Sequence, residues 1–312
     1  HPAGLVSVEV TQNDQQYTSG SLAFEYRDMV AHSIHPRSGP VLGGTEVVVR
    51  GASFDAPGAL GLFCSFGGSD VVGASFEGEA GVRCVTPPSA QPGAAAVQLV
   101  DSDAVLVTSV AFVYQPHVYV SSIEPVTGVL AGGTLLRVSG SGFLTSPSLL
   151  VRIGGLAPVQ ARVLSGGMLE CSTPAQPIAG LVSVEVTLNA RDYSSDEVVF
   201  EYLSPMRADE LSPPRGPSSG GTLVNVTGWG FSRRAALLSY THARFNLTKV
   251  PVAWVSSREV HCVAPEHPAG LVSVEVTQND QQYTSGSLAF EYRDMVAHSI
   301  HPRSGPVLGG TE

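Results

Sequence analysis

Hydrophobic and polar residues alternate strictly along many short runs of the chain. In residues 181–187, Leu-Val-Ser-Val-Glu-Val-Thr, a valine occupies every second position from Val182, and polar residues lie between. A strand places successive side chains on opposite faces, so this period predicts a strand with one buried and one wet face. Similar runs are residues 46–50, 95–100, 134–138 and 198–202. No stretch keeps a helical period beyond two turns, so the sequence predicts strands throughout.

The strand runs belong to a repeat. The triplet Gly-Gly-Thr begins at positions 43, 132, 220 and 309, with spacings of 89, 88 and 89 residues. Each triplet follows a Pro-x-x-Gly approach, and the first three precede an alternating run that ends on glycine and an aromatic residue. Cys-x-x-Pro follows later in each unit, and an aromatic pair two residues apart closes it. About seven short strands in ~89 residues are typical of a β-sandwich.

The ordered set of motifs resembles the IPT/TIG family of immunoglobulin-like domains. The set is Ile-x-Pro-x-x-Gly-x-x-x-Gly-Gly-Thr, an alternating strand, Gly-x-Gly-Phe, Cys-x-Thr-Pro and Phe-x-Tyr, and it extends over three units. Ser53 departs from the pattern in the first unit, and Leu211 and Ala264 depart from it in the third. The resemblance implies a fold: all-β, with tandem immunoglobulin-like sandwiches in a linear array. Members occur in receptor ectodomains, large cell-surface proteins and some DNA-binding transcription factors, so the fold is implied more firmly than the function.

The landmarks divide the chain into five segments. Complete modules are expected at 28–116, 117–204 and 205–293, with the C-terminal part of a module at 1–27 and the N-terminal part of the next at 294–312. The linkers have nearly constant lengths, with 8 or 9 residues from a closing tyrosine to the next opening Ile or Leu. Pro116 and Pro205 restrict two of these joints. Short, equal joints favour a regular rod.

The first 46 residues are identical to the last 46, residues 267–312, at an offset of 266. Residues 1–27 lack the opening strands of a module, so their strand edges need a partner. A preceding copy of the sequence can supply it, covalently or by strand donation from another chain. The identity indicates a fibre or a very long array. A recent gene duplication without assembly, or one consensus period taken from a filament, would give the same sequence.

The low content of charged residues and the negative net charge limit the functions that we expect. Charged residues make up 14% of the chain, the net charge is −10, and Lys249 is the single lysine. Nucleic-acid binding requires basic patches, so it is not expected. No apolar run reaches the ~20 residues of a membrane span.

His32 and His35 should lie on opposite faces of a strand, which disfavours a shared metal. Asp196 and Glu197 lack the neighbours of a calcium loop, and no catalytic motif is present, so we expect neither enzyme nor cofactor.

The four cysteines fall into two groups. Cys64 and Cys84 lie 20 residues apart on neighbouring predicted strands of one module, which favours a disulfide in a secreted chain. Cys171 and Cys262 have no local partner, because Val151 replaces Cys64 in the second module and nothing clearly matches it in the third. They are interpreted as buried thiols, with an inter-chain bridge as the alternative.

Two sequons make the third module a candidate for glycosylation. They are Asn225 in Asn-Val-Thr and Asn246 in Asn-Leu-Thr. Val224 and Val226 share one strand face, so Asn225 should lie on the solvent side. Trp254 follows the alternation and is expected in the core, whereas Trp229 is either packed or exposed to stack on sugar or a neighbouring chain.

Together these features predict a non-enzymatic, extracellular structural protein that builds a long, glycosylated fibril. Its partners would be copies of itself, head-to-tail and laterally, and it would carry covalent glycans rather than a cofactor. The alternative is an adhesion or receptor ectodomain in which the modules act as spacers or ligand-binding units. A carbohydrate-processing enzyme with these modules as accessories would need a catalytic domain elsewhere.

Overall fold

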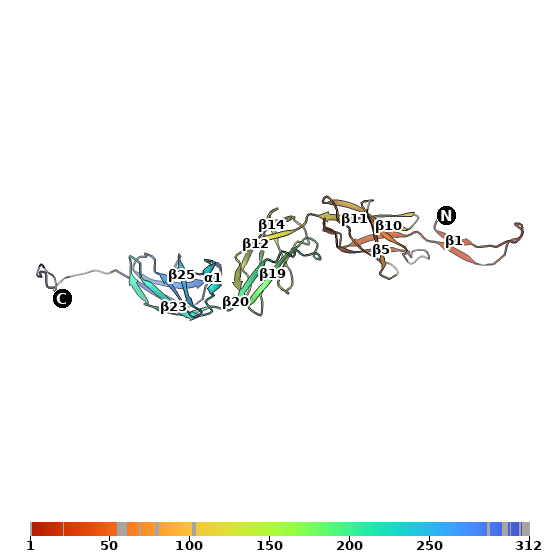
Figure 1. The fold of residues 1–312 in the computed structure, drawn as a ribbon. Coiled ribbons are helices and arrows are strands. Elements are labelled where there is room, and N and C mark those ends of the chain that lie inside the picture. The colour runs from red at the N-terminus through yellow and green to blue at the C-terminus, as the bar shows by residue number, and fades with distance from the viewer. Residues whose placement is uncertain are drawn as a thin grey trace.

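A computed structural model describes residues 2–20, 22–54, 61–68, 70–78, 81–101, 104–285, 288–294, 299, 301–305 and 307. Three β-sandwiches follow one another along an elongated molecule, and an N-terminal hairpin extends from the first (Figure 1). Each sandwich has a separate hydrophobic core. The structure therefore has the all-β tandem architecture that the repeat predicts.

The first module packs a four-stranded sheet on a five-stranded one. The first sheet has the order β3 (Val30–His35), β5 (Glu46–Ala52), β9 (Gly81–Val85) and β8 (Ser75–Phe76). The second has the order β4 (Ser38–Pro40), β11 (Ala104–Gln115), β10 (Gly93–Asp101), β6 (Phe63–Phe66) and β7 (Asp70–Gly73), with β4 parallel to β11.

The second module repeats this topology. Its sheets have the orders β12 (Tyr119–Glu124), β14 (Leu135–Ser141), β18 (Met168–Ser172), β17 (Arg162–Ser165), and β13 (Thr127–Val129), β20 (Val199–Leu203), β19 (Gly180–Thr187), β15 (Leu150–Ile153), β16 (Val159–Gln160). The alternation predicted for β19 holds where the strand enters the core, because Val184 and Val186 are buried.

In the third module the two sheets join through one long strand, β25 (Thr248–Ser256), which pairs with β24 on one side and β26 on the other. The strands are β21 (Arg207–Ser212), β22 (Arg215–Pro217), β23 (Leu223–Trp229), β24 (His242–Phe245), β26 (Glu259–Val263), β27 (Gly270–Thr277) and β28 (Leu288–Arg293). The prediction of strands alone is wrong for α1 (Arg233–Leu237), a short helix whose N-cap Ser232 accepts a hydrogen bond from the Ala235 backbone N–H. Five residues are too few to show a helical period.

The Gly-Gly-Thr turns have the same geometry in all three modules. The first glycine has φ of +72° at Gly43 and +73° at Gly132 and Gly220. A Cβ built there would lie within 2.6 Å of the backbone that follows the Cys-x-x-Pro cysteine. Only glycine fits this left-handed, crowded position, which explains why the triplet recurs at the module period.

The cysteines differ between modules because one position differs. Cys64 on β6 and Cys84 on β9 form a disulfide that connects the two sheets, with a Cα–Cα distance of 6.4 Å. Val151 occupies the Cys64 position in the second module, and Ala243, opposite Val276, occupies it in the third. Ala243 is the counterpart that the sequence did not reveal. Cys171 and Cys262 remain buried thiols, and burial raises the pKa of each to about 12.

Strict alternation fails near the start of the first module. A bulge between Ala31 and Ser33 in β3 shifts the register, so Ala31 and Ile34 both point into the core. His32 and His35 are both exposed, not on opposite faces as predicted. An extra residue at a bulge reverses the faces of all residues beyond it.

The N-terminal hairpin consists of β1 (Gly4–Ser7) and β2 (Ala23–Tyr26). Its register matches Gly4 to Tyr26, as the identical sequence in β27 and β28 matches Gly270 to Tyr292. No strand of the described residues pairs with either of its outer edges. Most of its apolar side chains are exposed, including Leu5, Phe24 and Tyr26.

Candidate functional site at the module joints

Each joint between modules is formed by a loop of one module and the Gly-Gly-Thr turn of the module before it. The joint loops are residues 187–193, between β19 and β20, and residues 277–283, between β27 and β28. Both have the pattern Thr-x-Asn-x-x-x-Tyr. The turns are residues 38–46 in the first module and 127–135 in the second.

An asparagine shapes each joint loop from inside. Asn279 Oδ1 accepts hydrogen bonds from the backbone N–H groups of Gln281 and Gln282, at 3.1 and 3.0 Å. Asn189 Oδ1 accepts from the backbone N–H groups of Arg191 and Asp192, at 3.0 and 2.9 Å. The residue after each asparagine has a positive φ. Asparagine is suited to this role because its short amide bonds to the backbone two residues on.

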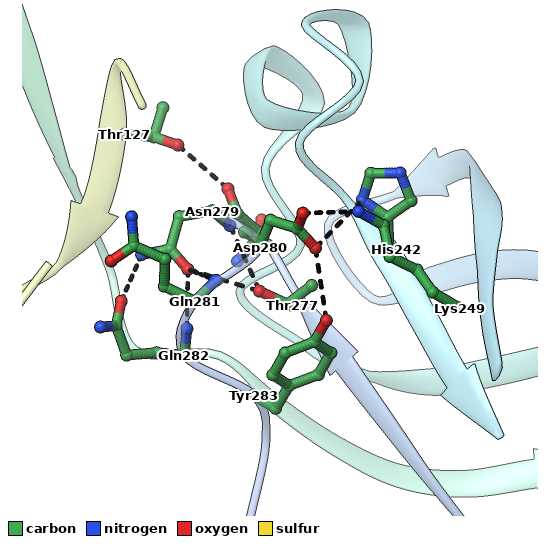
Figure 2. Close-up of polar contacts among 10 residues, drawn as sticks. Thr127, His242, Lys249, Thr277, Asn279, Asp280, Gln281, Gln282 and Tyr283 are labelled. Carbon is green, nitrogen blue, oxygen red and sulfur yellow. Dashed lines mark hydrogen bonds and ion pairs between the residues drawn. The ribbon is translucent and has the colours of Figure 1, made fainter. Parts of the chain in front are cut away.

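Amides form the joint between the second and third modules, and Figure 2 shows the loop that carries Asn279, Gln281 and Gln282. Asn279 Nδ2 donates to Thr134 Oγ1 at 3.2 Å, and Thr134 Oγ1 donates to Gln282 Oε1 at 3.0 Å. Gln281 binds the backbone of Leu135 twice, accepting from its N–H at 2.7 Å and donating to its carbonyl at 2.8 Å. Gln282 Nε2 donates to the Gly133 carbonyl at 3.2 Å.

A further bond lies at the edge of this contact, where Thr127 Oγ1 donates to the Gln278 carbonyl at 3.0 Å. Thr127 and Thr134 are 0% exposed, and Asn279 is buried as well. Breaking the bonds of these three side chains would leave a buried polar group unsatisfied, at a cost of about 1–3 kcal/mol. The bonds that Gln281 and Gln282 make to the backbone of the second module are exposed. The contact therefore fixes the third module on the second.

The joint between the first and second modules uses charge at the same positions. Thr45 Oγ1 donates to Asp192 Oδ2 at 2.7 Å, and Asn189 Nδ2 donates to the Ser38 carbonyl at 2.8 Å. Arg191 forms an ion pair with Glu46 at 3.3 Å. Arg191 and Asp192 correspond to Gln281 and Gln282, and Glu46 corresponds to Leu135. The two joints therefore have the same backbone arrangement, but the first uses charged side chains where the second uses neutral ones.

A cavity of about 780 Å³ opens beside the second joint. Its lining residues are Glu124, Pro125, Leu135, Arg137, Leu238, Ser239, Tyr240, His242, Lys249, Asn279, Asp280 and Gln281. Lys249 Nζ and Asp280 Oδ2 form an ion pair at 2.5 Å, and His242 Nδ1 lies 4.0 Å from Asp280 Oδ1. Burial lowers the pKa of His242, the positive charge of Lys249 lowers it further, and Asp280 partly opposes both effects.

The other sequence-predicted residues of the third module form none of the joint hydrogen bonds described above. Asn225 lies in β23 between the buried Val224 and Val226, on the outer face as the alternation predicts. Asn246 is exposed at the turn from β24 to β25. Trp229 is exposed, and Trp254 packs against the core with its Nε1 donating to the Phe231 carbonyl at 3.0 Å.

Among the described residues, no group of three or more His, Cys, Asp or Glu side chains is placed to hold a metal ion. Among the same residues, no helix has the length and apolar character to cross a membrane.

Sequence reasoning missed the joint residues. Their signal was present, because Thr-x-Asn-x-x-x-Tyr occurs at 11–17, 187–193 and 277–283. Neither the alternation nor the charge of these residues singles the motif out, and its partner turn lies about 150 positions earlier in the chain.

The family profile described as IPT/TIG domain matches residues 29–114, 119–202 and 207–292. Fibrocystin-L of Mus musculus is 29% identical over 191 residues, which cover 61% of this chain and 4% of that protein. Plexin-B1 of Homo sapiens is 31% identical over 209 residues, which cover 63% of this chain and 10% of that protein. A solved structure of the plexin A4 full extracellular region covers 90% of this chain and 26% of its own, at 16% identity and a TM-score of 0.42.

The three sandwiches and the three profile matches define a tandem array of immunoglobulin-like domains. The chain belongs to the IPT/TIG domain family. The matched part covers 4% of the length of fibrocystin-L and 10% of the length of plexin-B1.

Proposed function

We propose that the chain is a non-enzymatic spacer of an extracellular receptor or adhesion ectodomain, and that its joints hold the modules in a fixed series. The observation that carries this proposal is the recurrence of one joint contact. The loop-on-turn arrangement occurs at both joints with equivalent residues, although the chemistry differs. Modules that moved independently of one another would not need buried hydrogen bonds at equivalent positions of successive joints.

The relatives support the ectodomain assignment. Plexins and fibrocystin-L share these domains with the chain, and the matched plexin A4 structure is described as an extracellular region. The disulfide between Cys64 and Cys84 is also in keeping with an oxidising compartment. In this role the modules set the distance and direction between the parts of a larger protein on either side.

Spin labels on neighbouring modules test the fixed geometry. Ala157 and Ala253 are exposed, in the second and third modules, and can be replaced by cysteine for labelling. The native thiols Cys171 and Cys262 are buried and should not react. Pulsed dipolar spectroscopy should give one narrow distance distribution between the two labels, and Asn279→Ala should broaden it.

The chain contains its own matched control. Asn13→Ala is the same substitution in a loop of identical sequence that contacts no other module among the described residues. It should leave the distribution unchanged. A distribution that is already broad in the unsubstituted chain would contradict the proposal.

A fibril-forming structural protein is the second candidate, favoured by the 46-residue identity between the two ends. In this reading the joints continue from copy to copy, and glycans at Asn225 and Asn246 cover a surface poor in charge. Electron microscopy of the native material should then show filaments with an axial repeat near three modules. Measuring the intact mass before and after deglycosylation tests whether these glycans are present, and an unchanged mass would contradict glycosylation at Asn225 and Asn246.

A further inference from the structure

The cavity beside the second joint has one wall from each of two modules. Glu124 and Arg137 lie on the wall from the second module, and Tyr240, Lys249 and Asp280 lie on the wall from the third. Its volume of about 780 Å³ is within the range of sites that bind small ligands, about 300–1,000 Å³. The two walls face each other only while the joint holds the modules in place.

Basic side chains occur on both walls. Lys249 is the single lysine of the chain, and its module, residues 205–293, has eight Lys and Arg against seven Asp and Glu, which gives the one complete module with a positive net charge. Arg137 is 61% exposed, and its ion pair with Glu170 is long, at 3.7 Å from Nε to Oε2. A guanidinium has five N–H donors and an ammonium has three, so a single ion pair leaves each of these cations with donors for a ligand.

Carboxylates lie beside these cations. Lys249 Nζ lies 2.5 Å from Asp280 Oδ2, and Tyr283 Oη donates to Asp280 Oδ1 at 3.3 Å. Figure 2 shows Lys249 and His242 together on one side of Asp280. On the other wall, the negative charge of Glu124 adds to the effect of burial in raising the pKa of Tyr240. The cavity therefore holds anionic acceptors as well as cationic donors.

This mixture of groups limits the class of ligand. A bare sulfate ion has no donor for Glu124 or Asp280, and their charges repel it. A saccharide with a carboxylate fits better, because the carboxylate accepts from Arg137 and Lys249 while the hydroxyl groups donate to the acidic side chains. The ring of Tyr240 offers an apolar surface to the C–H face of a sugar.

The first joint lacks this set of charges. The equivalents of Arg137, Lys249 and Asp280 there are Val48, Pro158 and Ala190. That joint still holds its loop on its turn, so the contact between modules does not need these three side chains. Their presence at the second joint is therefore explained better by a ligand than by the joint itself.

We propose that the cavity between the second and third modules binds an oligosaccharide that contains uronic acid, with Arg137 and Lys249 as partners of its carboxylate groups. The inference rests on the proposed function, because the cavity exists only while the joint is fixed. The ligand contacts both modules at once, so its binding stabilises the same arrangement of modules that creates the site. The pair of modules is then a saccharide-binding unit as well as a spacer.

Calorimetric titration of the whole chain tests the proposal. The probe is a hyaluronan tetrasaccharide, which carries glucuronate, and the neutral probe of equal length is chitotetraose. The acidic probe should bind reversibly, and the neutral one at least about tenfold more weakly, because it lacks the carboxylates. Arg137→Met and Lys249→Met should each raise the dissociation constant of the acidic probe about tenfold. The matched control is Arg258→Met, which removes an exposed cation outside the cavity and should leave that constant unchanged.

A second pair of variants tests the dependence on the joint. Thr134→Val removes hydrogen bonds of the second joint without changing a residue that lines the cavity, and it should weaken binding of the acidic probe. Thr45→Val is the same substitution at the first joint, where it removes the bond to Asp192, and it should leave binding unchanged. Equal effects of the two variants would contradict a site that depends on the second joint.

Several results would overturn the inference. They are the absence of binding at millimolar concentrations of the acidic probe, equal affinity for the neutral probe, and an equal loss of affinity in Arg258→Met. Sulfate or a hexaglutamate peptide that binds as tightly as the acidic probe would also contradict it, because the cavity would then recognise negative charge alone. Absence of binding with a narrow distance distribution between the spin labels would remove only this site, whereas a broad distribution would remove the proposed function.

Discussion

Residues 4–26 and 270–292 have the same sequence in two different surroundings. Both form a hairpin in the same register, and both shape the same loop around an asparagine. Yet Val8 is 42% exposed and Val274 is 0%, and Phe24 is 52% exposed and Phe290 is 0%. The pairing and the loop are thus set within the segment, whereas burial depends on the strands that cover it.

The strands that cover the second copy add to its stability, because they bury its apolar face. In the third module the apolar face of β27 and β28 packs into a core built with β21 to β26. Each side chain that moves from exposed to fully buried contributes about 1.5–3 kcal/mol. The ladder extends there to the pair of Val274 and Leu288, and at the equivalent place in the N-terminal hairpin the Val8 backbone N–H donates to the Leu22 carbonyl at 2.9 Å. Three predictions test this contrast and a fourth concerns the third module alone, and they run from the largest effect to the smallest.

Chemical labelling should show the greatest difference. Cysteine introduced by Val8→Cys should react with a thiol reagent at the rate of an exposed thiol. Cysteine introduced by Val274→Cys should react more than about 10³-fold more slowly, because reaction requires opening of the module. Comparable rates at the two positions would break the comparison.

Truncation of the closing phenylalanine should affect only one copy. Phe290→Ala should lower the free energy of unfolding of the third module by about 3–5 kcal/mol, because it leaves a cavity in the core. Phe24→Ala should change it by less than about 0.5 kcal/mol. Both tryptophans, Trp229 and Trp254, lie in the third module, so tryptophan fluorescence during denaturation reports on that module alone.

The asparagine pair sharpens the contrast at the joint. Asn279→Ala should lower the stability of the third module by about 1–3 kcal/mol, because Thr134 and the loop backbone lose a buried partner. Asn13→Ala removes the same internal bonds in an exposed loop and should not shift the fluorescence transition. Equal effects would show that the joint contributes nothing beyond the loop itself.

Acid should have the smallest effect, confined to the third module. The pKa of His242 is lowered in the folded state, first by burial and then by Lys249, and only partly restored by Asp280. As the pH falls below about 6.5, the unfolded state takes up the proton before the folded state does. Stability should therefore decrease from that pH downward to the lowered pKa, and His242→Gln should flatten this part of the profile. A gain in stability on acidification would contradict the assignment.

Several features could be predicted because their causes lie close together in the sequence. The two-residue alternation predicted the main strands, and the crowded left-handed glycine explains the Gly-Gly-Thr period. Cys64 and Cys84 could be paired because both lie in one module at sandwich spacing. The counterpart of Cys64 in the third module could not be predicted, since it is Ala243, which carries no chemical signature. The bulge in β3 and the short helix α1 also left no periodic signal.

The sequence by itself determined the sandwiches, their number, their order and the internal shape of each joint loop. These depend on alternation, turn residues and side chains that bond two or three positions away. Only the tertiary structure decided that Asn279 meets Thr134, 145 residues earlier, and that one copy of the hairpin is buried while its twin is exposed. Burial is a property of the surfaces that come together, and a segment carries no record in its own residues of what will cover it.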